Sequence, residues 1–299
     1  AASAVYQRQE LVFADLGVSS RARASVSPAL ATIESCVLPP TRRRNSHKNH
    51  YGHLLIVGGD EGMSGAVALA ARAAMRSGAG LVTALVHPQC RLALADSPEI
   101  MVLGWDALED KLDAASVVIV GPGLGESAAA RECLQRLRSA TQPMVIDASA
   151  LDAGFLSALD SGSRIITPHP GEAARLLSTT TAQVQADRLL ACEQLLERFA
   201  AVTVLKGSGT LIGEPGVTPP AINTRGNPGM ASAGMGDVLS GITGAMLGQG
   251  LAAADAARTA VYIHALCAEA FSETRDAPGL IASDIIENLP VVMRRLRGL

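Results

Sequence analysis

The feature that most constrains the fold is a repeated order of short apolar segment, glycine-containing turn and helix from residue 51 onward. Such an alternation predicts a mostly parallel sheet with helices on both faces, hence an α/β fold. Only 3% of the residues are aromatic, so Ala, Val, Leu and Ile must build the core, as is typical of buried parallel sheets. The expected strands cover residues 54–57, 81–86, 116–120, 144–146, 164–166 and 202–205, with a shorter one at 210–212.

The pattern also predicts helices and a domain boundary. Helices are expected at residues 64–77, 236–247, 253–272 and 284–289, the last capped by Ser283 and ending before Pro290. Before residue 40 we expect a short strand at 11–14 and a helix from Ser27-Pro28 to Val37. The chain begins with Ala, so we expect a truncated or processed product. We predict an N-terminal segment at 1–40 and one domain at 41–299.

Composition excludes several classes of protein. The chain has 299 residues and a formal net charge of −3, which argues against a nucleic-acid-binding protein. No apolar run approaches the roughly 18 residues of a membrane span. The five cysteines are widely spaced and form no C-x-x-C pair, so we expect reduced thiols in a cytoplasmic enzyme. The basic run at 41–48 is either a solvated connector or an arm that meets substrate phosphates.

Five segments that could bind a ligand or take part in catalysis lie at the ends of expected strands. In an open parallel sheet, ligands bind beyond the carboxyl ends of the strands. Each segment alone is a weak signal, and their shared position is the informative part. The segments are Gly58-Gly59, the turn at 121–125, Asp147, His169 and Lys206.

The strongest single signal is the sequence N-P-G-M-A-S-A-G-M-G-D at residues 227–237. Gly234 and Gly236 leave backbone N–H groups uncovered where the 236–247 helix is expected to begin, which favours an anion site. Asp237 at that position is interpreted as a base that accepts a proton from an incoming hydroxyl while the amides hold a phosphoryl group. The alternative is that Asp237 is only a helix cap.

Three further segments have both a functional and a structural interpretation. Lys206, Gly207, Ser208, Gly209 and Thr210 form either a turn that a flat ring or phosphate can approach, or a plain β-turn. Gly123 and Gly125 in G-P-G-L-G either let a nucleotide-like substrate lie close or only make a turn, and the spacing is no Rossmann fingerprint. His169 in T-P-H-P-G-E is held by prolines at the sheet edge, or is an ordinary hydrogen-bonded histidine.

Taken together, the motifs resemble the ADP-dependent NAD(P)H-hydrate dehydratases, a family with the ribokinase-like fold. The motifs are G-M-S-G at 62–65, R-S-G-A-G-L-V at 76–82, G-P-G-L-G, T-P-H-P-G-E, K-G-S-G-T and G-M-G-D-V-L-S-G, in collinear order over residues 40–299. The segment before residue 40 resembles the tail of an epimerase domain that is often fused upstream. Three motifs depart from the family's usual form, at Ser149, Ala233 and Asn49, and none of them removes Asp237.

The resemblance implies repair of hydrated NADH or NADPH. A phosphoryl group from ADP would be placed on the ring hydroxyl at C6, and its elimination as phosphate would restore the dihydronicotinamide. Asp237 would be the base, and Ala66, Gly125, His169 and Asp237 would match the family's substrate site. Lys206 to Thr210 with Gly236 would match the adenine-nucleotide site, and Gly234 with Gly236 would hold the phosphate.

The resemblance also carries secondary expectations. ADP is expected as co-substrate in preference to ATP, with Mg²⁺, for which we assign no protein ligands. A homo-oligomer, a tetramer in particular, is expected. Two alternatives stay open: a small-molecule alcohol kinase of the same fold, and a nucleotide-sensing domain without turnover.

Overall fold

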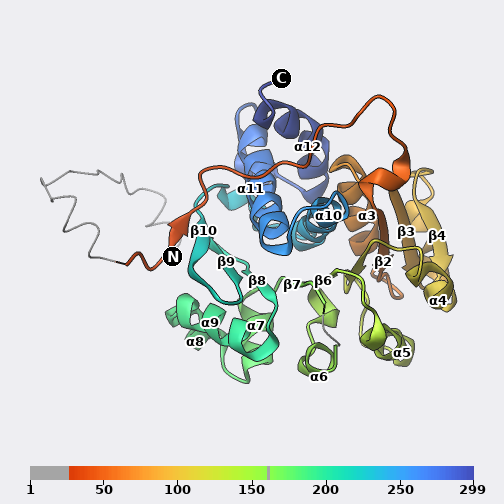
Figure 1. Ribbon diagram of the computed structural model, residues 1–299, viewed down its shortest axis with the longest axis horizontal. Coiled ribbons are helices and arrows are strands. Elements are labelled where there is room, and N and C mark those ends of the chain that lie inside the picture. The colour runs from red at the N-terminus through yellow and green to blue at the C-terminus, as the bar shows by residue number, and fades with distance from the viewer. Residues whose placement is uncertain (1–26, 160–161) are drawn as a thin grey trace, which may run out of the picture.

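The computed structural model describes residues 27–159 and 162–299. Within them ten strands form one sheet, in the order β1-β10-β9-β8-β7-β6-β5-β2-β3-β4 (Figure 1). The pairs from β8 to β4 are parallel, whereas β9 runs antiparallel to β8 and to β10. The strands are β1 Ala31–Thr32, β2 His53–Val57, β3 Leu81–Val86, β4 Met101–Gly104, β5 Val117–Val120, β6 Met144–Ile146, β7 Arg164–Ile166, β8 Val202–Leu205, β9 Thr210–Glu214 and β10 Val217–Asn223. The prediction of a mostly parallel sheet is confirmed.

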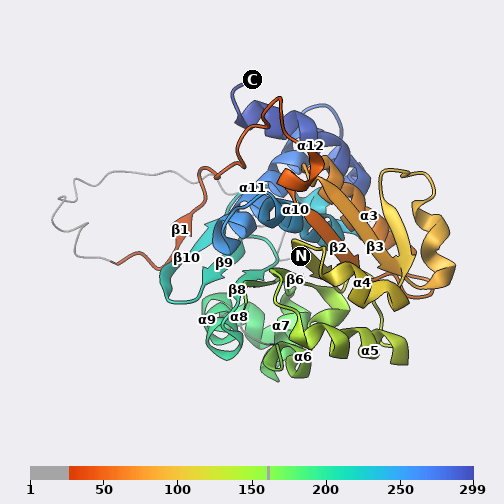
Figure 2. The ribbon, with the colours of Figure 1, turned by 45° about the vertical axis from the view of Figure 1, so that its right-hand side comes forward.

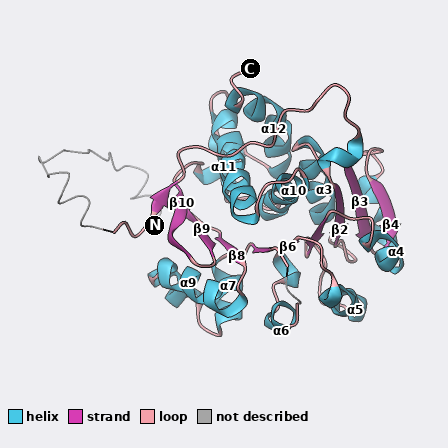
Figure 3. Ribbon diagram, in the orientation of Figure 1, coloured by secondary structure: helices cyan, strands magenta, loops and turns pink. Residues whose placement is uncertain are grey.

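Helices cover both faces of this sheet, as Figures 1 and 3 show. One layer consists of α3 Ser64–Arg76, α10 Met235–Gly248, α11 Ala253–Ser272 and α12 Ala282–Leu296. The opposite layer consists of α4 Leu108–Leu112, α5 Ala128–Arg136, α6 Ala153–Ser157, α7 Pro170–Leu177, α8 Thr181–Ala186 and α9 Arg188–Phe199. Turned by 45°, the molecule still shows the sheet between the two layers (Figure 2). None of the described helices has the length and apolar character needed to cross a membrane.

Burial on both faces explains why β2 is apolar from Leu54 to Val57. Leu54 and Ile56 belong to the core under α3, α10, α11 and α12, whereas Leu55 and Val57 belong to the core on the other face. All four side chains are fully buried. Successive strand residues point to opposite faces, so a strand covered on both sides needs apolar residues at every position.

The order of the strands places a switch point at β2. After β2 the chain continues to β3 on one side, whereas β5 pairs with β2 on the other side. Ligands bind at such reversals in open α/β sheets, in the crevice beyond the carboxyl ends of the strands. The loops that follow β2 and β5, which begin at Gly58 and Gly121, meet at this point.

The amino-terminal part differs from the prediction. Residues 27–37 form no helix; Ala31–Thr32 pairs with β10 instead, and the Ile33 amide donates to the Ile222 carbonyl (3.0 Å). This edge pairing and the side-chain bonds from α11 to the carbonyls of Glu34 and Val37 outweigh the local helix signals. The strand expected at 11–14 lies outside the described residues. The domain boundary at residue 40 stays a prediction.

The last helix is longer than predicted. α12 runs from Ala282 to Leu296 and passes through Pro290, and Ser283 lies inside it rather than at its cap. Ile285, Leu289 and Val292 recur at helical spacing and are buried against the core. The apolar area that this face buries offsets the one backbone hydrogen bond that Pro290 removes.

Candidate active site

The first turn of α10 presents free backbone amides beside a carboxylate. Gly234 is the cap residue, with φ of 84°, and the Val238 amide makes the first helical bond to its carbonyl (3.1 Å). The preceding amides of Met235, Gly236 and Asp237 therefore have no partner within the helix. A β-carbon at Gly234 would lie 2.5 Å from Leu69 Cδ1, so the Leu69 side chain would have to move. Glycine at this position thus permits both the turn and the packing.

Directly behind this turn lies a buried ion pair. Asp147 follows β6 and Lys206 follows β8; Lys206 Nζ donates to Asp147 Oδ1 at 2.8 Å. Ser240 Oγ, one turn further along α10, donates to Asp147 Oδ2 at 2.7 Å. A β-carbon on Gly236 would lie 3.4 Å from Lys206 Nζ and 3.6 Å from Asp147 Oδ2. Three segments that are far apart in the sequence therefore meet at Gly236.

Glu172 and His169 extend the cluster along the sheet edge. Glu172 Oε2 lies 3.7 Å from Lys206 Nζ and accepts a bond from the His169 amide (2.7 Å). His169 is the cap of α7, and its Nδ1 accepts bonds from the amides of Gly171 and Glu172. The side chain is about half exposed, and its Nε2 lies 3.4 Å from Glu172 Oε1. His169 therefore caps α7 and also has a ring that is partly accessible to solvent.

The charges of the cluster shift the pKa values of its members. Burial raises the pKa of Asp237 to about 6, and the negative charge of Asp147 adds to this, while Lys206 opposes it. Asp147 is buried too, which raises its pKa, but Lys206 and Ser240 more than compensate and its pKa is lowered. Burial lowers the pKa of Lys206, but Asp147 and Glu172 raise it above the ordinary value. Asp237 is therefore the carboxylate poised to exchange a proton near neutral pH.

The Lys206–Thr210 loop is shaped by glycines and held by an arginine. Gly207 and Gly209 have φ of 143° and 65°, which side-chain-bearing residues rarely adopt. The Arg188 guanidinium donates to the carbonyls of Leu205, Lys206 and Ser208. The only signal that the sequence gives for Arg188 is its place at the start of α9, which tertiary packing brings to this loop.

The glycine turn after β5 packs on the loop after β2. The Asp60 amide donates to the Gly123 carbonyl at 2.6 Å, and a β-carbon on Gly123 would lie 3.1 Å from Ala66 Cβ. Gly125 has φ of 70°, and its amide donates to Ser149 Oγ at 3.2 Å. Ala66, Gly123 and Gly125 therefore lie together at the switch point. Ser149, to which the sequence analysis assigned no role, holds this turn beside Asp147.

The donor set argues against a metal ion held by the protein alone. Lys206 lies between Asp147 and Glu172, where its ammonium group balances both carboxylates. In residues 27–159 and 162–299, no group of three or more His, Cys, Asp or Glu side chains is arranged to hold a metal. Mg²⁺ typically binds one or two carboxylates together with substrate phosphates. The cluster fits an ion that arrives with phosphate ligands of its own.

Comparison with known proteins shows which protein family this chain resembles. The family model described as NAD(P)H-hydrate dehydratase matches residues 54–291. A bifunctional NAD(P)H-hydrate repair enzyme of Coxiella burnetii is 44% identical over 86% of this chain and 53% of its own length. An ADP-dependent (S)-NAD(P)H-hydrate dehydratase of Neisseria meningitidis is 42% identical over 82% of this chain and 86% of its own length.

Solved structures agree with the sequence comparisons. An ADP/ATP-dependent NAD(P)H-hydrate dehydratase of Bacillus subtilis, co-crystallised with ATP and Mg²⁺, gives a TM-score of 0.77 at 30% identity and covers 86% of this chain and 94% of its own. A ribokinase-like superfamily protein of Enterococcus faecalis gives 0.81 at 28% identity, with 91% and 98% covered. The fold is therefore ribokinase-like, as expected.

The share of a relative's own length that this chain covers differs among the relatives. The chain spans about half the length of the bifunctional relatives that it matches, but most of the Neisseria meningitidis dehydratase. The family model covers more than half of the chain, and it includes the glycine turns, Asp147, His169, Lys206 and Asp237. The protein with this charge cluster at its sheet edge is a member of the NAD(P)H-hydrate dehydratase family.

Proposed function

We propose that the chain dehydrates hydrated NADH or NADPH at the expense of ADP. The substrate hydroxyl would attack the β-phosphoryl group of ADP and release AMP; elimination of phosphate would then form the ring double bond. The observation that carries the proposal is Asp237, whose pKa is raised to about 6, next to the free amides at the start of α10. A carboxylate with such a pKa can accept the hydroxyl proton at neutral pH.

The neighbouring groups would stabilise the transferring phosphoryl group. The amides of Met235, Gly236 and Asp237, which have no partner within the helix, would donate to the phosphoryl oxygens, and the helix dipole would add to the attraction. Lys206 is held 2.8 Å from Asp147, so its ammonium group is fixed before the nucleotide arrives. Fixed charges need no reorganisation during the transfer, which is the main electrostatic advantage of such a site.

The two substrates would occupy neighbouring parts of the sheet edge. Lys206, Gly207, Ser208, Gly209 and Thr210 would bind the adenine nucleotide, with Gly234 and Gly236 at its phosphates. Ala66, Gly123, Gly125, His169 and Asp237 would bind the hydrated dinucleotide. The positive φ angles of Gly123, Gly125 and Gly209 shape the turns that would border the two ligands. Mg²⁺ would be held mainly by the nucleotide phosphates and would neutralise their charge.

The test is a coupled optical assay. Purified protein is mixed with hydrated NADH, ADP and Mg²⁺, and the recovery of the NADH absorbance band is followed together with free phosphate. We expect one phosphate released for each NADH restored. An alcohol kinase would instead keep the phosphate on its product, and absence of NADH recovery would refute the proposal.

The preference for ADP is tested in the same assay. Initial rates are compared with ADP and ATP at equal concentration, and the proposal expects the faster rate with ADP. A clear preference for ATP would contradict it. A homo-oligomer, expected to be a tetramer in the cytoplasm, also remains a proposal, which light scattering and fractionation would test.

A further inference from the structure

Two adjoining pockets lie at the opposite end of α10 from Asp237. Each has a volume of about 360 Å³, and they flank residues 39–46, which we call the strap. Gln249, the C-terminal cap of α10, lines both pockets. Along α10, Gln249 lies 12 residues after Asp237, so the helix separates the pockets from Asp237 by about 18 Å. The pockets are thus distinct from the proposed dehydratase site.

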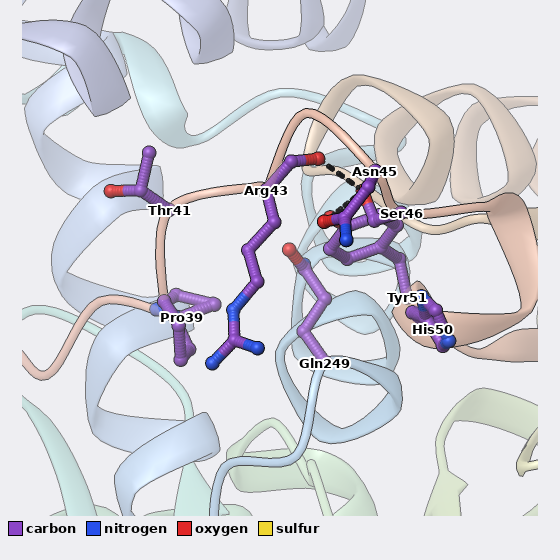
Figure 4. Close-up of a pocket in the computed structure, with 9 residues that line it drawn as sticks. Pro39, Thr41, Arg43, Asn45, Ser46, His50, Tyr51 and Gln249 are labelled. Carbon is purple, nitrogen blue, oxygen red and sulfur yellow. Dashed lines mark hydrogen bonds between the residues drawn. The ribbon is translucent and has the colours of Figure 1, made fainter.

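The lining of these pockets is strongly basic. No Asp or Glu side chain is among the lining residues. Among the residues that the structure describes, no carboxylate side chain forms an ion pair with any of the lining arginines. In Figure 4 the Arg43 side chain points into the space between Pro39 and Gln249. The arginines are Arg42 and Arg43 of the strap, Arg76 at the end of α3, and Arg294 and Arg297 at the end of α12.

Two of the guanidinium groups are held in place by neutral partners. Arg42 donates to the Gly78 carbonyl at 2.8 Å and lies 4.1 Å from the centre of the Tyr51 ring. Arg297 donates to Thr41 Oγ1 at 3.4 Å. These contacts orient the cations without neutralising their charge. The arrangement is fixed before any anion arrives, which lowers the entropy lost on binding.

The negative ends of nearby helices offset only part of the positive charge. The C-termini of α3, α10 and α12 meet here, and each carries about −0.5 of an elementary charge. Against five arginines, these helix ends leave an excess of roughly +3.5. In a chain with a net charge of −3, such a local excess favours the binding of an external anion.

We propose that the two pockets form a binding site for a polyphosphate anion, a chain of two or three phosphoryl groups. Guanidinium groups match phosphate oxygens in geometry as well as in charge. Two pockets that share the strap residues Pro40 and Thr41 suit an extended ligand rather than a single phosphate. The same chemistry occurs in inorganic polyphosphate and in nucleoside polyphosphates. The site is independent of the dehydratase proposal, because it shares no residue with it.

The test compares two sets of charge removals on the same helix end. One variant combines Arg294→Gln with Arg297→Gln, inside the pocket. The control is Arg295→Gln, which removes a neighbouring arginine that pairs with Glu273 (2.9 Å) and does not line the pocket. Binding of inorganic tripolyphosphate is measured by calorimetry at low ionic strength. Thermal unfolding of both variants checks that they fold.

We expect the wild type and Arg295→Gln to bind tripolyphosphate with the same affinity. The double variant should bind it at least about tenfold more weakly. Added salt should weaken the affinity of the wild type in the same way. Equal affinity in all three proteins would overturn the proposal, because the phosphate would then bind elsewhere, including at the start of α10. No binding by the wild type would overturn it too. If the double variant fails to fold, Arg76→Gln, an exposed arginine on α3, replaces it with the same expectation. A parallel titration with ADP distinguishes the sources: a second, weaker ADP event lost in the double variant indicates a nucleotide.

Discussion

Replacing Asp237 by Asn should stabilise the folded protein at the same time as it removes turnover. In the folded state, burial and Asp147 hold the pKa of Asp237 at about 6, against an ordinary value of 3.8. The folded state therefore binds this proton more tightly than the unfolded state. The stability that this tighter proton binding contributes is complete below pH 4 and is lost as the pH rises through 6. Above that pH, the ionised carboxylate destabilises the fold.

The size of this effect follows from the pKa difference. A difference of about two units at 1.36 kcal/mol per unit gives about 3 kcal/mol at pH 8. Asn has nearly the same shape and no charge, so it would recover most of this amount, and about 3 kcal/mol is the upper limit. The gain should shrink between pH 6 and pH 4 and vanish below. Turnover should fall by about 10²- to 10⁴-fold, because general-base catalysis is lost.

Urea unfolding of wild type and variant across this pH range measures the stability difference. Asp110→Asn is the matched control, since Asp110 lies exposed in the first turn of α4 and away from the site. Its substitution should change the free energy of unfolding by no more than about 0.5 kcal/mol. If Asp237→Asn is no more stable than the wild type at pH 8, the carboxylate is not desolvated. Asp237 would then lack the raised pKa that poises it to exchange a proton near neutral pH.

Three further predictions concern the same cluster and its packing. The kcat/KM of the wild type should fall as the pH drops through about 6, because Asp237 takes up a proton; a profile that stays flat to pH 5 would contradict this assignment. Lys206→Met should lower the free energy of unfolding by about 3–5 kcal/mol, because Asp147 is left buried without its partner. Adding Asp147→Asn should restore part of this loss in denaturant titrations, and a single variant as stable as the wild type would argue against the pair. Gly241→Ala should destabilise by about 1–3 kcal/mol, because its β-carbon would lie 2.2 Å from a carbonyl of α3. Gly65→Ala has nothing within 4 Å of its new β-carbon and should not destabilise; equal losses in the two alanine variants, measured by urea unfolding, would refute the packing argument.

The elements that the sequence predicted well are those whose local and tertiary signals agree. The strands at 81–86, 144–146, 164–166 and 202–205 and the helix at 253–272 have the predicted bounds. Their apolar runs are flanked by turns, so burial and local preference favour the same structure. The placement of Asp147, His169 and Lys206 at one edge also followed from the sequence, because parallel strands end on the same side of a sheet.

The predictions of secondary structure that were wrong concern segments whose structure depends on residues distant in the sequence. The helix expected to begin at Ser27-Pro28 was wrong because the backbone of β1 pairs with β10, about 190 residues later in the sequence. The break expected at Pro290 was wrong because the apolar face of α12 continues to pack beyond it. Arg188 and Ser240 escaped notice, and Ser149 was assigned no role, for the same reason, since each acts on a segment that is remote in sequence.

The sequence by itself determined the α/β class, the glycines that open the start of α10 and the identity of Asp237, because these depend on periodicity and on local backbone chemistry. Only the tertiary structure decided which charges lie together. Lys206 reaches Asp147 across 59 residues and Ser240 reaches it across 93, and the burial that results sets the pKa of Asp237. The basic pockets also exist only in the fold, where the strap meets the ends of three helices. Electrostatic energies depend on distance and burial in space, and the order of residues along the chain contains neither directly.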